Sequence, residues 1–158
     1  MDVTLWTDEG RFHYRVAAVI LHDGKILAMR DERSSFYYLP GGRVSIGETA
    51  ENAIKRELRE ELDIDAGIIR PLWVHQNFYT DDVDRQDYHI LCLYFLIDAE
   101  KTDLFSRGES FTHHDQNHIH EFEWLDCERL TEEYFYPLFL KKAILHLPEH
   151  LELLTTVE

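Results

Sequence analysis

One stretch decides how the rest of this sequence is interpreted: Gly41-Gly42-Arg43-Val44-Ser45-Ile46-Gly47-Glu48-Thr49-Ala50-Glu51-Asn52-Ala53-Ile54-Lys55-Arg56-Glu57-Leu58-Arg59-Glu60-Glu61-Leu62-Asp63-Ile64. Residues 49–62 contain neither proline nor glycine, and Thr49 is a suitable N-cap, so they predict a helix. At about 100° per residue, the apolar side chains of this helix form one stripe that should face a core. The members of that stripe are Ala50, Ile54, Leu58 and Leu62.

Three glutamates of the same helix fan outward from the edge of this stripe. Glu61 lies about 20° from Ile54 on the helical wheel, and Glu57 and Glu60 follow on the same side. Like charges spaced i, i+4 repel each other, and a carboxylate near a core loses hydration, so the cluster is costly without compensation. A hard divalent cation such as Mg²⁺ or Mn²⁺ prefers oxygen ligands and would resolve both costs. The alternative is an ordinary charged surface helix, with its glutamates paired to neighbouring Lys and Arg side chains.

The composition limits the classes of protein that fit. A chain of 158 residues with 44% hydrophobic residues can bury one core, so we expect a single domain over residues 1–158. The 31 acidic and 16 basic residues give a net charge of −15, which repels a phosphate backbone. Binding to a nucleic acid duplex is therefore not expected. Cys92 and Cys127 form no CxxC pair, which leaves zinc ribbons and disulfide frameworks without ligands.

The sequence also lacks the segments that direct a chain into or across a membrane. Residues 1–11 carry acids and no long apolar run, which excludes a secretory signal. Nowhere do about 18 apolar residues follow one another, as a membrane-spanning helix requires. We therefore expect a soluble cytoplasmic protein without membrane contacts.

The segments before the glutamate-rich helix predict short strands. Residues 14–21 and 25–30 are mostly apolar runs joined by the turn dipeptide Asp23-Gly24, which predicts a β-hairpin. Residues 36–39 predict another short strand, which Pro40 and the two glycines after it should end.

The segments after the helix predict further strands and a closing helix. Residues 67–79 and 88–97 should form an antiparallel pair, and residues 119–125 alternate as a half-buried strand does. Residues 99–118 are polar and irregular, which predicts a long loop. Residues 136–154 have helical spacing of leucines and should form a helix divided at Pro148. Together the elements predict an α/β fold, with a mixed sheet and helices packed on it.

The spacing within the opening stretch resembles the Nudix box of the Nudix hydrolase family. The resemblance comprises Gly42, five residues, Glu48, seven residues, then Arg56-Glu57-Leu58, one residue, Glu60-Glu61 and the apolar Ile64. One defined position departs from the family, which has glycine where this chain has Asp63. Aspartate tolerates the left-handed conformation of a helix exit better than most residues, so we expect a slightly altered loop and an intact metal site.

The resemblance implies a fold, a reaction and a set of site residues. The fold would be the α/β/α Nudix sandwich with a mixed β-sheet, and the reaction a divalent-metal-dependent hydrolysis of a phosphoanhydride bond in a nucleoside diphosphate derivative. Glu57, Glu60 and Glu61 match the metal-binding glutamates of the family. The Gly42 carbonyl is a further ligand, Glu48 a supporting acid, and Arg56 the arginine that holds a glutamate in place.

Several assignments stay open at this point. Arg30, Arg33 and Arg43 flank the two glycines and are candidates for contacts with substrate phosphates. The general base could be Glu57, which we favour, or Glu109, or an acid after Asp115. Four histidines between residues 113 and 120 could bind a transition metal, but their spacing matches no standard zinc pattern, so a solvated loop is preferred.

Two other readings compete with a hydrolase. A Nudix-fold protein could bind a nucleotide as a sensor without cleaving it, although a sensor would be expected to have lost box glutamates. The acidic helix could also be purely structural, in which case added Mg²⁺ would leave thermal stability unchanged. The sequence does not specify the substrate, the number of metal ions or the oligomeric state, and a homodimer is compatible with its 13% aromatic residues.

Overall fold

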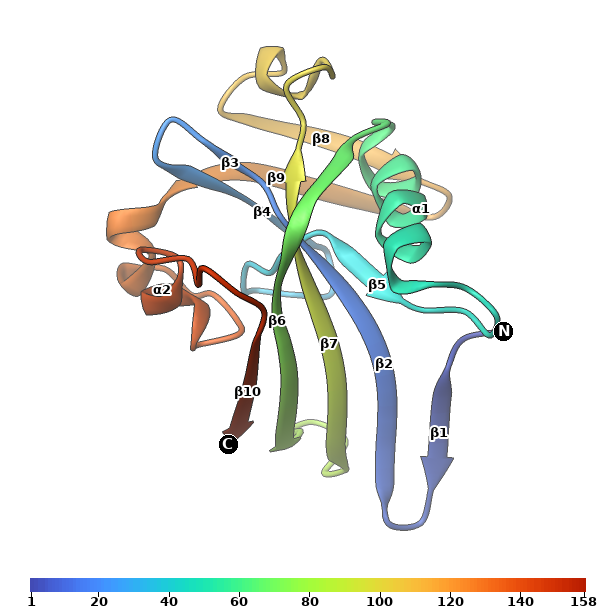
Figure 1. Cartoon of the computed structure of the whole chain (residues 1–158). Helices are drawn as coiled ribbons and strands as arrows, with labels where there is room; N and C mark the ends of the chain where they lie inside the picture. Colours follow the sequence, from blue (N-terminus) through green and yellow to red (C-terminus); the bar gives the residue numbers. More distant parts are fainter.

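The computed structural model describes residues 1–158 and arranges ten strands in two sheets beside one long helix (Figure 1). The strands are β1 Thr4–Thr7, β2 Gly10–Val19, β3 Leu21–His22, β4 Lys25–Asp31, β5 Gly41–Arg43, β6 Gly67–Thr80, β7 Asp87–Asp98, β8 Ser110–Asp115, β9 His118–Asp126 and β10 Glu152–Val157. The helices are α1 Ala50–Leu62 and the single-turn α2 Leu140–Ala143, with 3-10 turns at Leu104–Ser106 and Cys127–Glu132. None of these helices is both long and apolar enough to cross a lipid bilayer.

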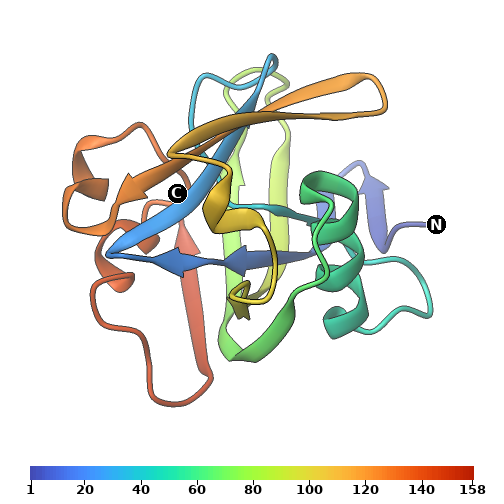
Figure 2. The same ribbon diagram turned by 90° about the horizontal axis from the view of Figure 1, so that it is seen from above.

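The two sheets differ in size and direction. The larger sheet has six strands in the order β1-β2-β7-β6-β10, with β5 also paired to β2. It is mixed, because β2 runs parallel to β7 and β10 runs parallel to β6. The smaller sheet, β3-β4-β9-β8, is antiparallel throughout and lies across one end of the larger sheet (Figure 2). This arrangement confirms the predicted α/β class with a mixed sheet.

Helix α1 begins and ends where the sequence predicts. The Thr49 hydroxyl accepts a hydrogen bond from the Asn52 N–H at 3.1 Å, which satisfies one of the free donors of the first turn. Asp63 follows the helix in the left-handed conformation, with φ 53° and ψ 46°, and its N–H donates to the Arg59 carbonyl. Aspartate therefore takes the conformation that glycine would adopt at this exit.

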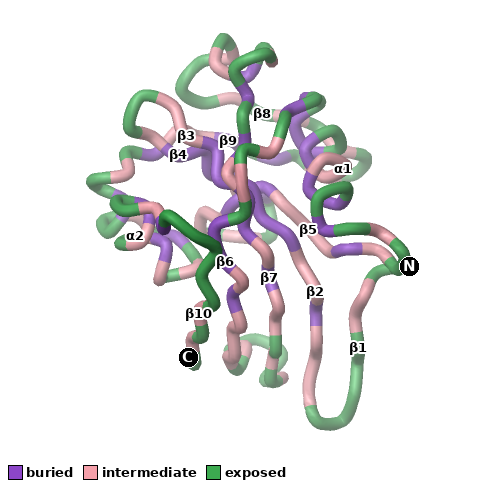
Figure 3. Tube along the Cα trace, viewed as in Figure 1, coloured by how far each residue is buried: buried purple, intermediate pink, exposed green.

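Hydrophobic side chains pack against both faces of the larger sheet. Along β2, Val16 and Ala18 point toward α1, whereas Ala17 and Val19 point toward a second core on the opposite face. Figure 3 shows the buried trace concentrated where α1 and the smaller sheet meet the larger one. The far ends of β1, β2, β6 and β7 are half-buried or exposed, so that end of the sheet is open to solvent.

Most of the predicted strands are confirmed. The β6 and β7 ribbon is antiparallel as predicted. The Asp23-Gly24 turn is also confirmed, with positive φ at both residues, but only Leu21–His22 pair across it with β4. Residues 14–19 belong to β2 and pair with β7 in the other sheet, so the predicted hairpin is wrong over most of its first strand. In β9, His120 and Phe122 are buried while Ile119 and Glu121 are exposed, as the alternation predicts.

Three further local predictions are wrong. Residues 36–39 form only isolated bridges, Met29 with Tyr38 and Tyr37 with Phe135, because Tyr37 and Tyr38 pair with different segments. The predicted loop at residues 99–118 contains strand β8, whose alternating inward side chains are a phenylalanine, a histidine and an aspartate. These residues lack the apolar alternation that marks a strand in sequence.

The predicted helix at residues 136–154 is also wrong over most of its length. Only α2 is helical, although Leu140 and Ile144 are buried as the spacing implies. The last residues instead form β10, where Thr155, Thr156 and Val157 are β-branched and extend the larger sheet beside β6. The side of the larger sheet opposite α1 is therefore covered by single-turn helices and loops rather than by a long helix (Figure 1).

One histidine of the larger sheet should make stability depend on pH. His75 is 1% exposed, its Nε2 lies 2.8 Å from the Thr156 hydroxyl, and burial lowers its pKa to about 4. Because the unfolded state binds the proton more tightly, stability is full above pH 6.5 and is lost as the pH falls toward 4, by up to about 3 kcal/mol. Denaturant unfolding across this range should show the loss in the wild type and a smaller loss in His75→Gln. If both proteins lost the same amount of stability over this pH range, His75 would not be the cause. His13, whose pKa is also lowered to about 4, remains in both proteins and explains the loss that His75→Gln should retain.

Candidate active site

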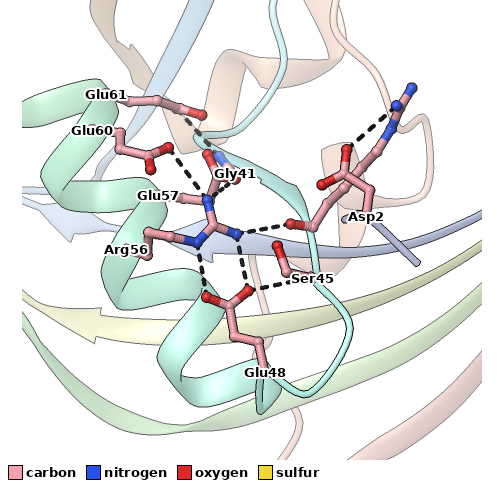
Figure 4. A network of polar contacts seen from close by, with 9 residues as sticks. Asp2, Gly41, Ser45, Glu48, Arg56, Glu57, Glu60 and Glu61 are labelled. Carbon is pink, nitrogen blue, oxygen red and sulfur yellow. Dashed lines mark hydrogen bonds and ion pairs between the residues drawn. The ribbon is translucent and has the colours of Figure 1, made fainter. Parts of the chain in front are cut away.

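Arg56 lies at the centre of a network that joins α1 to the loop before it (Figure 4). Its Nε and Nη2 donate to the two oxygens of Glu48 at 2.8 and 3.0 Å, which is a bidentate ion pair. Nη1 donates to Glu57 at 2.9 Å and to Glu60 at 3.3 Å, and Nη2 also donates to the Arg43 carbonyl at 3.0 Å. One guanidinium therefore fixes the loop and two helix glutamates at the same time.

Glu57 and Glu61 form a pair of acids at the inner edge of the helix. Glu61 is only 7% exposed, shares a hydrogen bond with Glu57, and accepts a weak one from the Gly41 N–H at 3.4 Å. Burial and the neighbouring Glu57 carboxylate raise the pKa of Glu61 well above its ordinary value, and burial also raises that of Glu57. Two carboxylates in contact cannot both stay ionised at low cost, so the pair requires a shared proton or a bound cation.

Gly42 allows the Glu57 carboxylate to lie directly against the backbone of β5. A Cβ atom at this position would lie 2.2 Å from Glu57 Oε1 and 2.4 Å from its carboxyl carbon. The φ of Gly42 lies outside the positive range, so its backbone conformation alone does not require glycine. Glycine is needed because any side chain here would collide with the Glu57 carboxylate.

The donors gathered here suit a hard divalent cation. They are carboxylate oxygens beside backbone of β5, and no sulfur or imidazole takes part. No group of three His, Cys, Asp or Glu side chains in residues 1–158 is close enough together to hold a metal ion. Glu60 stands apart because it is turned toward Arg56, with half of its side chain exposed. The buried Glu61 and the half-buried Glu57 are thus the part of the predicted ligand set that the fold brings together.

Both oxygens of Glu48 are already engaged. They accept from Arg56, and Oε1 also accepts from the Ser45 N–H at 3.1 Å. Hydrogen bonding to Arg56 lowers the pKa of Glu48, in contrast to the raised values of the pair. This geometry favours Glu48 as a residue that positions Arg56.

Replacing Gly42 by alanine should therefore damage the site while leaving the fold intact. We expect turnover to fall roughly 100-fold, because Glu57, which the resemblance implies to be a metal ligand, would be displaced by about an ångström. The free energy of unfolding should change by less than about 1 kcal/mol, since the backbone conformation accepts alanine. Gly67→Ala is the matched control, because a Cβ at Gly67 would meet nothing within 4 Å. Wild-type activity in Gly42→Ala would contradict the close approach.

The three arginines predicted to contact phosphate all lie beside acids. Arg30 donates to Glu121 at 2.8 Å, and Arg33 donates to the buried Asp31 at 2.8 Å. Arg43 lies 3.6 Å from Asp2, a longer contact, and belongs to β5 next to Gly42. Among the three, Arg43 is the most loosely held, and its backbone is next to Gly42, but its side chain lies on the opposite face of the larger sheet from Gly42.

The other segments considered from the sequence lie on the smaller sheet. Glu109 is exposed and pairs with Lys25 at 3.0 Å. His113 and His120 face each other across β8 and β9, and neither Nδ1 atom has a hydrogen-bond partner. His118 lies 3.0 Å from Glu32. The histidines thus belong to a strand pair, and the donor group they provide is too small for a metal site.

The chain is similar to known proteins in sequence and in fold. The model of the NUDIX domain family matches residues 11–146. The chain is 33% identical over 111 residues to an 8-oxo-dGTP diphosphatase of Proteus vulgaris, covering 65% of this chain and 90% of that protein. It is 33% identical over 87 residues to an ADP-ribose pyrophosphatase of Methanocaldococcus jannaschii, covering 53% of this chain and 49% of that protein. Other curated relatives are matched over less than half of their own length.

A solved structure shows the same fold. The MutT protein of Bacillus halodurans superposes with a TM-score of 0.58 and 15% identity, covering 92% of this chain and 90% of that one. Because the family model matches most of the sequence, the chain belongs to the Nudix family of hydrolases. Members of this family generally use divalent metal ions, and the two relatives described above are named for small nucleotide substrates.

Proposed function

We propose that this chain hydrolyses a phosphoanhydride bond in a nucleoside diphosphate derivative, with Mg²⁺ or Mn²⁺ held by Glu57, Glu60 and Glu61. The observation that carries the proposal is the contact of the buried Glu61 with the half-buried Glu57 against Gly42, with both pKa values raised. A structural helix has no need for two acids in contact, whereas a cation site does.

Each residue of the proposed site would have a separate role. The bound cation would neutralise pyrophosphate charge and acidify or orient the attacking water. Glu57 and Glu61 would hold it from the inner edge of α1, and Glu60 would join them by leaving its 3.3 Å contact with Arg56. The Gly42 carbonyl remains a proposed ligand, and Glu48 supports the site through Arg56. We keep Glu57 as the proposed base, since its raised pKa favours holding a proton.

The substrate proposed here is a small nucleotide, such as a nucleoside triphosphate, a nucleotide sugar or an ADP-ribose-like compound. The net charge of −15 supports a small ligand over a nucleic acid duplex. Arg43 is the first candidate for a phosphate contact, while Arg30 and Arg33 would have to leave close ion pairs to make one. A cytoplasmic location and a single domain over residues 1–158 remain part of this proposal.

A nucleotide sensor of the same family is the second candidate. It would bind the same ligands without cleaving them. The complete set Arg56, Glu57, Glu60 and Glu61 favours the hydrolase, because binding alone does not require these carboxylates.

The experiment that tests the proposal measures release of phosphate and nucleoside monophosphate from a panel of nucleotides with Mg²⁺ or Mn²⁺. Wild type is compared with Glu60→Gln and Glu61→Gln, and with Glu51→Gln, an exposed position in the first turn of α1. Turnover that requires metal, collapses in the first two variants and persists in the third supports the hydrolase. Nucleotide binding without turnover on any compound would establish the sensor instead.

A further inference from the structure

Strand β10 is an edge of the larger sheet, and no strand of this chain pairs with its outer side. It pairs with β6 alone, while β1 forms the opposite edge (Figure 1). The free N–H and C=O groups of an edge strand are a template for another strand. Edge strands often prevent such pairing with lysine, proline or a bulge, but β10 contains neither lysine nor proline and its register with β6 is unbroken.

The inner side of β10 is firmly attached, so the strand presents a fixed edge. His75 Nε2 lies 2.8 Å from the Thr156 hydroxyl, which donates to Asn77 Oδ1 at 2.9 Å. The Glu158 N–H donates to the Phe78 carbonyl at 2.8 Å. These contacts tie β10 to β6 along its length and leave its outer backbone groups at fixed positions.

The direction of the backbone groups determines which residues can bond to a further strand. Because the Glu158 N–H points to β6, the even-numbered residues of β10 point inward. Backbone directions alternate along a strand, so Leu153, Thr155 and Val157 present their N–H and C=O groups outward. All three residues are exposed. A partner strand would have to bond at these positions.

Apolar side chains accompany the outward backbone groups. Leu153 is 70% exposed and Val157 is 79% exposed, and both lie on the face of the sheet that carries α1. Their neighbours across β6, Val74 and Phe78, are half-buried on the same face. Leu151, just before the strand, is 52% exposed. A strand laid against β10 would therefore cover apolar surface as well as form backbone hydrogen bonds.

A second copy of β10 fits this edge in an antiparallel register with a two-fold axis at Leu154. The facing pairs are then Leu151 with Val157, Leu153 with Thr155, Glu152 with Thr156 and His150 with Glu158. Every pair joins two residues of the same face, and residues with outward backbone groups face one another. No acid faces another acid.

Other registers of the same pairing are worse. A slip of one residue would bring side chains of opposite faces together. A slip of two residues in one direction places Glu152 opposite Glu158, and like charges directly opposite each other are destabilising. The slip in the other direction places Val157 opposite Glu149, which ends the apolar row. Charge and apolar pattern thus select the register centred on Leu154.

We propose that this chain forms a two-fold symmetric dimer in which the β10 strands of two copies pair antiparallel and join the two larger sheets into one. An isologous contact of this kind closes after two copies, whereas β10 on the β1 edge of another copy would continue into a filament. The contact is short, so we expect a dissociation constant of about 1 to 100 µM. The inference does not rest on the proposed function, because no residue of the candidate active site takes part.

The first test measures the mass of the protein by sedimentation equilibrium at concentrations from about 1 to 500 µM, which bracket the expected dissociation constant. The wild type should convert from monomer to dimer without larger species. Since each copy carries a net charge of −15, added salt should strengthen the dimer. A wild type that stays monomeric at every concentration and salt, or that assembles beyond a dimer, would overturn the proposal.

The same measurement on two lysine variants identifies the edge. Leu153→Lys should raise the dissociation constant at least about tenfold, because it places a charge in the apolar row. Leu5→Lys is the matched control, since Leu5 is 60% exposed on the β1 edge, and it should dimerise as the wild type does. Circular dichroism and denaturant unfolding verify that both variants are folded. Unchanged dimerisation of folded Leu153→Lys would show that β10 is not the interface.

A cysteine variant tests the register. Facing residues of a non-hydrogen-bonded antiparallel pair have Cα atoms about 4.5 Å apart, which a disulfide can span. Mild oxidation should therefore link two copies of Leu154→Cys. It should not link Glu152→Cys, whose copies would lie about 13 Å apart, or the wild type, which has Cys92 and Cys127. Equal linking of the two variants, or none in Leu154→Cys, would contradict the register.

Discussion

Glu61→Gln should lower turnover by a factor on the order of 1,000 and, without divalent cations, make the protein more stable. The activity falls because a carboxylate of the proposed metal site is lost. The stability rises by about 1 kcal/mol, because the variant removes a like-charge contact between the buried Glu61 and Glu57. The introduced amide can still accept the Gly41 N–H and donate to Glu57, so the local hydrogen bonds are retained.

The stability of the metal-free protein should also depend on pH differently in the wild type and in Glu61→Gln. Burial and Glu57 raise the pKa of Glu61 in the folded state, so its contribution to stability is present below pH 4.5 and is lost as the pH rises toward the folded pKa. Glu61→Gln should lose this decline. Thermal unfolding in the presence of a chelator, at several pH values, measures both effects, with Glu51→Gln as the control. A less stable variant in metal-free buffer would contradict the account of the pair.

Arg56→Gln should destabilise the fold by about 3 kcal/mol and abolish activity. The arginine joins Glu48, Glu57, Glu60 and the Arg43 carbonyl, and its loss leaves largely buried acids without a counter-charge. Denaturant unfolding and the nucleotide assay together measure the two consequences. Activity should be lost even under conditions where the variant is fully folded, because Glu57 is no longer held.

The matched control lies one turn further along the same helix. Arg59 is 60% exposed and pairs with Asp65, itself 82% exposed, so Arg59→Gln should change the stability by no more than about 0.5 kcal/mol. Equal effects in the two variants would mean that the Arg56 network stabilises no more than a surface ion pair does.

The sequence predicts the parts of this fold whose local signals agree with their packing. Helix α1, its Thr49 cap and its Asp63 exit follow from capping preferences and apolar spacing, both of which act within a few residues. The β6 and β7 pair is equally clear, because apolar strand residues flank a polar turn. In these elements the tertiary contacts reinforce the local preference.

The errors arise where distant contacts decide the structure. Strand β10 exists because β6 offers it a parallel partner, which no local pattern in residues 152–157 reveals. Strand β8 carries few apolar residues and depends on pairing with β9. The long-range requirement also explains why Tyr37 and Tyr38 form bridges to different segments rather than one strand.

The site also combines features that local sequence signals predict with features that depend on long-range contacts. The spacing of Glu57, Glu60, Glu61, Arg56 and Glu48 picks out the residues that the fold gathers along one side of α1 and the loop before it. The face of the sheet on which the Arg43 side chain lies was not predicted, because only the pairing of β5 with β2 sets it. The ion pairs of Arg30 and Arg33 were equally hidden, since the partners of an exposed arginine depend on the tertiary fold.

The most direct test of the central claim is the binding of Mn²⁺ followed by electron paramagnetic resonance, because it reports the metal site without requiring a substrate. The wild type should remove the signal of free Mn²⁺ as protein is added, and Mg²⁺ should restore it by competition. Glu61→Gln should bind Mn²⁺ at least about tenfold more weakly, while Glu51→Gln should bind as the wild type does. Equal binding by the wild type and Glu61→Gln would contradict the assignment of the buried glutamate pair as the metal site.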